Sequence, residues 1–151
     1  MAETLGSLCD KLIIVKLKQW HSEDTQRLES LSKQEIQLQQ EIDLYLSSAV
    51  SGCIPRERLT FDSNKVYKKE GNQITEAIGS IGDIFSQLAM VNCQLWHEQE
   101  KIYEFEKVPI EAKDVVVKQL ALLNLQRNNC IDSIDKQFSN MVKTFDTATS
   151  S

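Results

Sequence analysis

Two histidines, the only ones in this 151-residue chain, each stand three residues before an acidic residue. On a helix, this spacing places the imidazole and the carboxylate on one face, where both could bind a metal ion. The candidate ligands are His21, Asp24, His97 and Glu100. Metal sites in helical bundles usually draw carboxylates from all four helices and use the order Glu-x-x-His, which is reversed here. The alternative is that each histidine follows a tryptophan packed in the helix seam, with the acid holding the ring N–H.

A second group of polar residues falls on apolar helical stripes. Arg127 lies on such a stripe, and a buried guanidinium needs a carboxylate or several carbonyl acceptors. We expect a polar layer that fixes the helix register, built from Asn92, Trp96, Asn124 and Arg127, with Trp96 mostly buried against Leu120 and Leu123. The alternative is a pocket for an anionic ligand, formed by Asn92, Arg127 and Asn128.

Nucleophilic catalysis has weaker support. Cys9 precedes His21 by about three helical turns, too far for contact along one helix. The paired acid clusters of all-helical nucleotide hydrolases could draw only on Glu98, Glu100, Glu104, Asp132 and Asp135. The residues therefore favour a non-enzymatic protein without a cofactor, and a hydrolase or metal-dependent enzyme is the alternative.

The four cysteines are widely spaced and form no Cys-x-x-Cys pair, which argues against a zinc site and a disulfide framework. A reducing compartment is expected, and the alternative is a disulfide that involves Cys53. The first residues do not resemble a secretory signal, and no segment approaches the roughly 18 apolar residues of a membrane span. These features predict a cytoplasmic protein.

Composition favours a single all-α domain over residues 1–151. Apolar residues make up 41% and charged residues 26%, which are ordinary globular values, and the formal net charge is −5. Five glycines and two prolines are too few for the many turns of a β-sandwich or barrel. A chain of this length can bury one core without staples.

Apolar residues recur at spacings of three and four along most of the chain, which predicts helices. The first runs from Leu5 to Leu31, because Ser32-Lys33-Gln34-Glu35 matches a capping box that begins the second helix. The second helix must end by Gly52 and Pro55. Hairpin one therefore spans residues 4–50.

A third helix begins between Thr75 and Ser80, and Pro109 opens a fourth, so hairpin two spans residues 75–146. The long connection, residues 51–74, is basic between Arg56 and Lys69. It is interpreted as a solvated linker, or as a contact for an anionic partner, but it lacks the broad patch of a nucleic-acid binder. The four helices predict an all-α, four-helix bundle made of two antiparallel hairpins.

A repeat relates the two hairpins. A shift of 76 residues places Thr4–Leu8 on Ser80–Ile84 and Trp20-His21 on Trp96-His97. This similarity predicts that the hairpins are duplicates and that the first and third helices play equivalent roles.

At these residues the chain resembles a small bacterial all-helical family known only as a domain of unknown function. The family pattern is Asn-x-x-Leu-Trp followed by acids, then Leu-Asn-x-x-Arg-Asn-x-x-Ile-x-x-Ile-Asp. The matching segments are 20–24, 92–97 and 123–135. In two departures, Lys16 stands where the second copy has Asn92, and Gln99 replaces an expected acid. The family's setting among surface-polysaccharide and glycosyltransferase genes implies a cellular context and no particular reaction.

Unequal helix lengths predict self-association. The second helix, residues 32–50, would be about 28 Å long and the fourth, residues 110–146, about 55 Å. Near its end the fourth helix carries an apolar stripe of Phe138, Met141, Val142 and Phe145, which either the connection, through Ile54, Leu59, Phe61 and Val66, or a second copy would cover. We therefore predict a protein that acts by protein–protein interaction, with homodimer formation, and keep an anionic-ligand site around Arg127 as the alternative.

Overall fold

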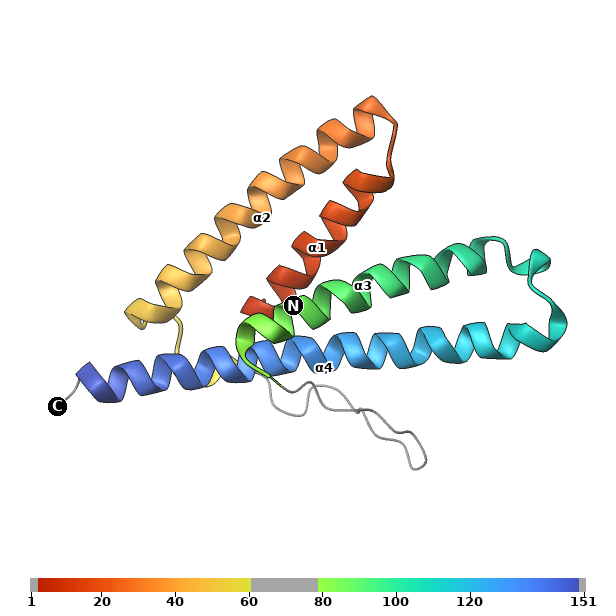
Figure 1. The fold of residues 1–151 in the computed structure, drawn as a ribbon. Coiled ribbons are helices and arrows are strands. Elements are labelled where there is room, and N and C mark those ends of the chain that lie inside the picture. Colours follow the sequence, from red (N-terminus) through yellow and green to blue (C-terminus); the bar gives the residue numbers. More distant parts are fainter. Residues whose placement is uncertain (1–2, 61–78, 150–151) are drawn as a thin grey trace. The chain divides into compact units, whose positions relative to one another are not determined.

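The computed structural model describes residues 3–60 and 79–149. Within these ranges the chain forms the helices α1 (Leu5–His21), α2 (Thr25–Ser51), α3 (Ile81–Tyr103) and α4 (Ile110–Thr149), with single 3-10 turns η1 (Arg56–Arg58) and η2 (Phe105–Lys107) (Figure 1). The described residues contain no strand. The predicted all-α class is confirmed.

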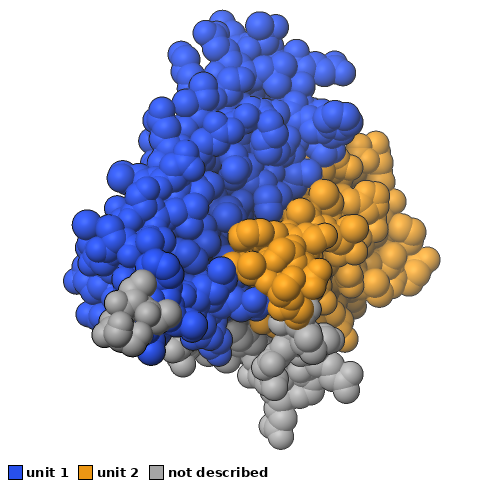
Figure 2. All heavy atoms as spheres, turned by 60° about the vertical axis from the view of Figure 1, so that its left-hand side comes forward, with its two compact units in different colours: residues 1–64, 131–151 blue, residues 65–130 orange. Residues whose placement is uncertain are grey.

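The chain divides into two compact units (Figure 2). Unit 1 comprises residues 1–64 and 131–151, and unit 2 comprises residues 65–130. Helix α4 supplies residues to both, so the division does not follow the predicted hairpin boundaries.

The first helix ends earlier than the sequence pattern indicated. Helix α1 stops at His21, and Asp24 caps α2 by accepting hydrogen bonds from the backbone N–H groups of Gln26 and Arg27 at 2.9 and 3.2 Å. The predicted break before Ser32 is wrong, because the Ser32–Glu35 segment lies inside α2. The aspartate satisfies two N–H groups that a helix start leaves unpaired, so no second cap is needed further along.

Helix α3 begins at the edge of the predicted interval, Thr75 to Ser80, and α4 begins after Pro109 as predicted. Ser80 caps α3 and exchanges hydrogen bonds with Asp83 in a capping box, and Pro109 directly precedes α4. Helix α2 ends at Gly52, whose φ of 86° is easy only for a residue without a Cβ.

Each unit has buried apolar residues along its helices. Helices α1 and α2 pack together in unit 1. The buried side chains of that unit include Leu5, Leu8, Val15, Leu31, Tyr45, Leu59, Phe138 and Val142. In unit 2, Val91 and Leu95 of α3 form a core cluster with Leu123 of α4, against which Leu120 packs.

The predicted duplication finds a match at the helix starts. Thr4 with Ser7 and Ser80 with Asp83 form capping boxes at positions related by the 76-residue shift. Packing differs at the next equivalent pair, because Gly6 is buried and Gly82 is exposed. Duplication of whole hairpins stays a prediction.

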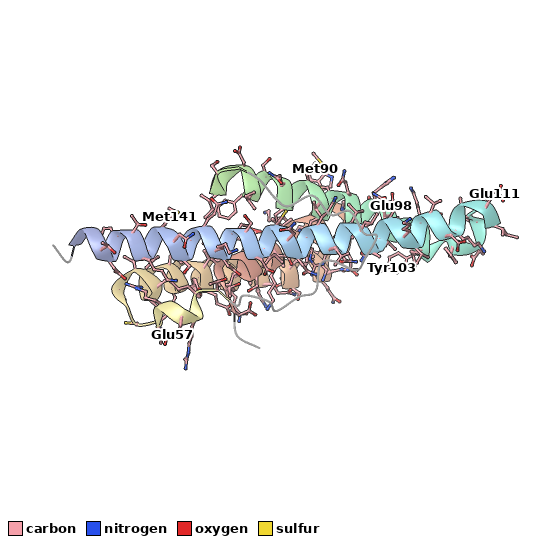
Figure 3. All side chains as sticks on the ribbon, turned by 90° about the horizontal axis from the view of Figure 1, so that it is seen from below. Glu57, Met90, Glu98, Tyr103, Glu111 and Met141 are labelled. Atoms are coloured by element: carbon pink, nitrogen blue, oxygen red, sulfur yellow. The ribbon has the colours of Figure 1, made fainter. Side chains whose placement is uncertain are left out.

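The apolar stripe near the end of α4 is partly covered within unit 1. Phe138 and Val142 are buried, and the Phe138 ring lies 6.2 Å from that of Tyr45 on α2. Leu59, in the connection, is completely buried, whereas Phe61 and Val66 lie outside the described residues. Met141, labelled on the last turns of α4 in Figure 3, stays 56% exposed and Phe145 55%.

The unequal helix lengths that supported self-association are less unequal than predicted, because α2 is longer. Helix α2 has 27 residues, so at 1.5 Å per residue it spans about 40 Å and not the expected 28 Å.

The cysteines Cys9, Cys53, Cys93 and Cys130 are all free. In the parts of the chain that the structure describes, no helix combines the length and apolar character of a membrane span.

Candidate functional site

The polar residues predicted as a layer occupy unit 2. Asn92 is buried, and its side-chain amide donates a 3.1 Å hydrogen bond to the Leu88 carbonyl one turn earlier. Asn124 is exposed and donates in the same way to the Leu120 carbonyl. These two hydrogen bonds run within the helices that carry them. A layer of four residues that links α3 to α4 therefore stays a prediction.

Trp96 is only half-buried, which differs from the expected burial. Its indole N–H is bonded as predicted, because it donates to Glu100 at 3.1 Å. Arg127 and Asn128 are also half-buried, so a pocket of these residues with Asn92 stays a prediction as well.

The two histidine–acid pairs do not share one geometry. His21 is the last residue of α1 and Asp24 lies beyond the helix end as the cap of α2, so the expectation that they share a helix face is wrong. The Nδ1 atom of His21 lies 2.8 Å from the Leu17 carbonyl oxygen. Trp20 is 86% exposed, so the expectation that it packs in a helix seam is also wrong.

The second pair does lie within one helix. His97 is exposed on α3, and Glu100 follows one turn later, where it accepts the Trp96 N–H. Among the described residues, no group of three or more His, Cys, Asp or Glu side chains is placed to hold a metal ion. Metal binding by His21, Asp24, His97 and Glu100 therefore has no geometric support.

Asp135 of α4, in unit 1, is a buried acidic residue with a perturbed pKa. Its side chain is 3% exposed, and its Oδ1 accepts a 2.7 Å hydrogen bond from the backbone N–H of Gly6. The Thr4 hydroxyl also bonds to this carboxylate. Burial raises the pKa of Asp135 to about 6, and the negative charge of Asp132 raises it further. The two hydrogen bonds from Thr4 and Gly6 lower the pKa and offset part of this rise.

Two other titratable side chains lie near Asp135. The pKa of Cys9 is raised to about 11 by burial and by the charges of Asp135 and Asp10. The pKa of Tyr45 is raised to about 12, mainly by burial. Both groups therefore keep their protons at neutral pH, and a thiol is a poor nucleophile compared with a thiolate. This cluster joins α1 to α4 and offers no activated nucleophile.

The spacing of residues along the sequence could not identify the cluster of Asp135, Cys9 and Tyr45. Asp135 appeared among the acids of the fourth helix, but Gly6 is separated from it by 129 residues. One local indication exists: Gly6 is a glycine in the first turn of a helix, where a close approach of another backbone explains its presence.

Comparison of the chain with protein-family models, with curated proteins and with solved structures finds no match. The resemblance to the bacterial helical family therefore stays a prediction.

Proposed function

We propose that this protein is non-enzymatic and acts by binding another protein through the turn that joins α3 to α4. The observation that carries the proposal is the exposure of two apolar side chains beside that turn. Tyr103, at the end of α3, is 82% exposed, and Ile110, at the start of α4, is 83% exposed. Val115 and Val117, further along α4, are also exposed.

The turn itself is well ordered by local contacts. Within η2, the backbone N–H groups of Lys107 and Val108 donate to the carbonyls of Glu104 and Phe105 at 2.9 and 3.1 Å. The ammonium of Lys113 lies 4.8 Å from the centre of the Phe105 ring. A turn held in this way loses little conformational freedom on binding.

Tyrosine is suited to such a contact because it is enriched among the residues that contribute most to protein–protein binding. In the sequence it is flanked by Glu98, Glu100, Glu104 and Glu106. Lys101 pairs with Glu98 and Lys107 with Glu104, which leaves a net negative charge. A partner with an apolar centre and a basic rim complements this surface.

The test uses a photo-crosslinking phenylalanine analogue placed at position 103 in the full chain. After irradiation in an extract of the source cells, adducts are identified by mass spectrometry. We expect one predominant protein adduct from position 103. The control is the same analogue at position 20, because Trp20 is an equally exposed aromatic residue in unit 1. Identical adducts from both positions, or none from position 103, refute the proposal.

Self-association through α4 is a second proposal. Met141 and Phe145 are more than half exposed and lie four residues apart, so they occupy one face of the helix. A second copy of the chain that buries this face twice would form a twofold dimer.

A cytoplasmic location completes the proposal. Its support is the presence of four free cysteines, two of which, Cys53 and Cys93, are exposed. Exposed thiols persist in reducing compartments.

A further inference from the structure

A groove lies between α1 and α2 in unit 1, away from the turn proposed above as the protein-binding surface. Its volume is about 320 Å³. Each helix supplies one row of four side chains at spacings of three and four, from Lys11 to Lys18 and from Gln34 to Glu41. The volume falls at the lower end of the range for small-molecule sites.

The floor of the groove is apolar. Val15 is buried, and Ile14 and Leu38 are half-buried beside it. Apolar atoms of a bound molecule would lose contact with water on this floor, which favours binding in proportion to the area covered.

At one end of the groove the cation is ion-paired and the carboxylate keeps its negative charge. Lys11 forms an ion pair with Glu3, and Glu41 accepts a 3.3 Å hydrogen bond from the Gln37 amide. This end therefore offers little attraction to an anionic ligand.

The other end of the groove holds an uncompensated cation. The ion pair between Lys16 and Glu35, at 2.8 Å, fixes the register of α1 against α2 and places Lys18 and Gln34 toward the turn between them. Within residues 3–60 and 79–149, the side-chain ammonium of Lys18 forms no ion pair or hydrogen bond. Its ammonium is free to bind an anion, and the Gln34 side chain lines the same end.

We propose that this groove binds a small organic anion with an apolar chain, a carboxylate of medium chain length, with its head at Lys18. Each row of lining residues is about 11 Å long at 1.5 Å per residue. This length accommodates an extended chain of about eight carbons and is too short for a partner helix of several turns. The site is separate from Tyr103 and Ile110, so the two proposals stand or fall independently.

The test is a titration of the full chain with octanoate, followed by the amide resonances in ¹H–¹⁵N spectra. We expect saturable shifts confined to residues 11–18 and 34–41. Octanol, which lacks the charge, should bind about tenfold more weakly, because the loss of one charge-assisted hydrogen bond has about this effect.

Two variants distinguish the contact between the octanoate carboxylate and Lys18 from nonspecific hydrophobic binding to the surface. Lys18→Gln removes the charge and keeps a polar side chain, and it should weaken octanoate binding about tenfold without changing octanol binding. Lys33→Gln is the matched control, because Lys33 is an exposed lysine of α2 next to Gln34 that does not line the groove; it should leave octanoate affinity unchanged. Circular dichroism confirms that both variants keep their helices.

Three outcomes overturn the proposal. They are shifts that do not saturate, shifts centred on Met141 and Phe145 and not on the groove, and equal octanoate affinities of the wild type and Lys18→Gln.

Discussion

The backbone N–H of Gly6 donates a 2.7 Å hydrogen bond to Oδ1 of Asp135 and thereby joins the first turn of α1 to α4. The absence of a side chain at Gly6 permits this approach. A Cβ at this position would stand 2.5 Å from the carbonyl oxygen of Ile131 and 3.0 Å from Asp135 Oδ1. Backbone atoms cannot move aside as a flexible side chain can, so the contact restricts residue 6 to glycine.

We expect Gly6→Ala to destabilise the protein by about 1–3 kcal/mol, the usual cost of overpacking. Gly82→Ala is the matched control, because Gly82 occupies the same helical position and a Cβ there would meet only Ser80 Oγ, at 3.9 Å. This control should be neutral or slightly stabilising, since alanine favours helix over glycine. Urea unfolding of both variants decides the matter, and a Gly6→Ala protein as stable as the wild type contradicts the close contact.

Asp135 should make stability depend on pH in the direction opposite to an ion-paired carboxylate. Its pKa rises from 3.8 to about 6 in the folded state, so folding favours the protonated form. The stabilising contribution is full below pH 3.8 and is lost as pH rises through about 6.

Asp135→Asn removes this titration and keeps a side-chain oxygen for the Gly6 N–H. The free energy of unfolding of the variant, relative to wild type, should therefore increase between pH 4 and 7, by at most about 3 kcal/mol. Asp43→Asn, on an exposed position of α2, controls for the loss of one carboxylate. A difference that is constant over this pH range would show that Asp135 does not titrate there.

Arg56 connects three segments of unit 1. Its guanidinium donates to both carboxylate oxygens of Asp146, at 2.6 and 2.8 Å, and also bonds to the carbonyls of Ala49 and Val50 at the end of α2. Arg56→Lys cannot reproduce the bidentate contact and should lower the free energy of unfolding, measured in urea, by about 1–2 kcal/mol. Arg58→Lys, at an exposed neighbour, should cost almost nothing, and equal losses for the two variants would refute the role of Arg56.

The two tryptophans should differ in fluorescence although their sequence contexts are similar. We expect the Trp96→Phe protein, which retains exposed Trp20, to emit at longer wavelength and to be quenched more strongly by acrylamide than the Trp20→Phe protein. We also expect Trp96→Ala to destabilise the protein more than Trp20→Ala, because Trp96 is half-buried and bonded to Glu100. Equal quenching of the two single-tryptophan proteins would contradict the structure.

Self-association through α4 is tested by sedimentation equilibrium at micromolar concentration. We expect a dimer of the 17.2 kDa chain that dissociates when Met141 and Phe145 are both replaced by glutamate, because the charges would be buried in the interface. Ile36→Glu, at a similarly exposed residue of α2, is the control and should leave the dimer intact. A wild-type protein that is monomeric under these conditions refutes the second proposal.

The features that were predictable from sequence are those set by neighbouring residues. Helical periodicity indicated the all-α class. The interval from Thr75 to Ser80 bracketed the start of α3, and Pro109 located the start of α4. The same reasoning misplaced the start of α2, because Ser32–Glu35 has the residue types of a capping box and still lies within a helix. Asp24, a single residue with strong capping preference, decided the boundary.

The environment of individual side chains depended on contacts distant in sequence. The similar Trp-His pairs differ in burial because α1 ends beside Trp20 while α3 continues beyond Trp96. Likewise, nothing near Asp135 in the sequence predicts that its partner is the backbone of Gly6. The two Trp-His pairs therefore have similar sequences but different structural environments.

Helix α4 has a consequence for the order in which the chain folds during synthesis. Unit 2 is continuous in sequence, and its two helices join through a short turn, so it can form as soon as residues up to 130 have left the ribosome. Unit 1 needs residues 131–149 to complete its core, which holds Leu5 and Phe138. Helices α1 and α2 precede unit 2 in the chain but complete their core after it, so their apolar surface stays exposed until α4 is finished.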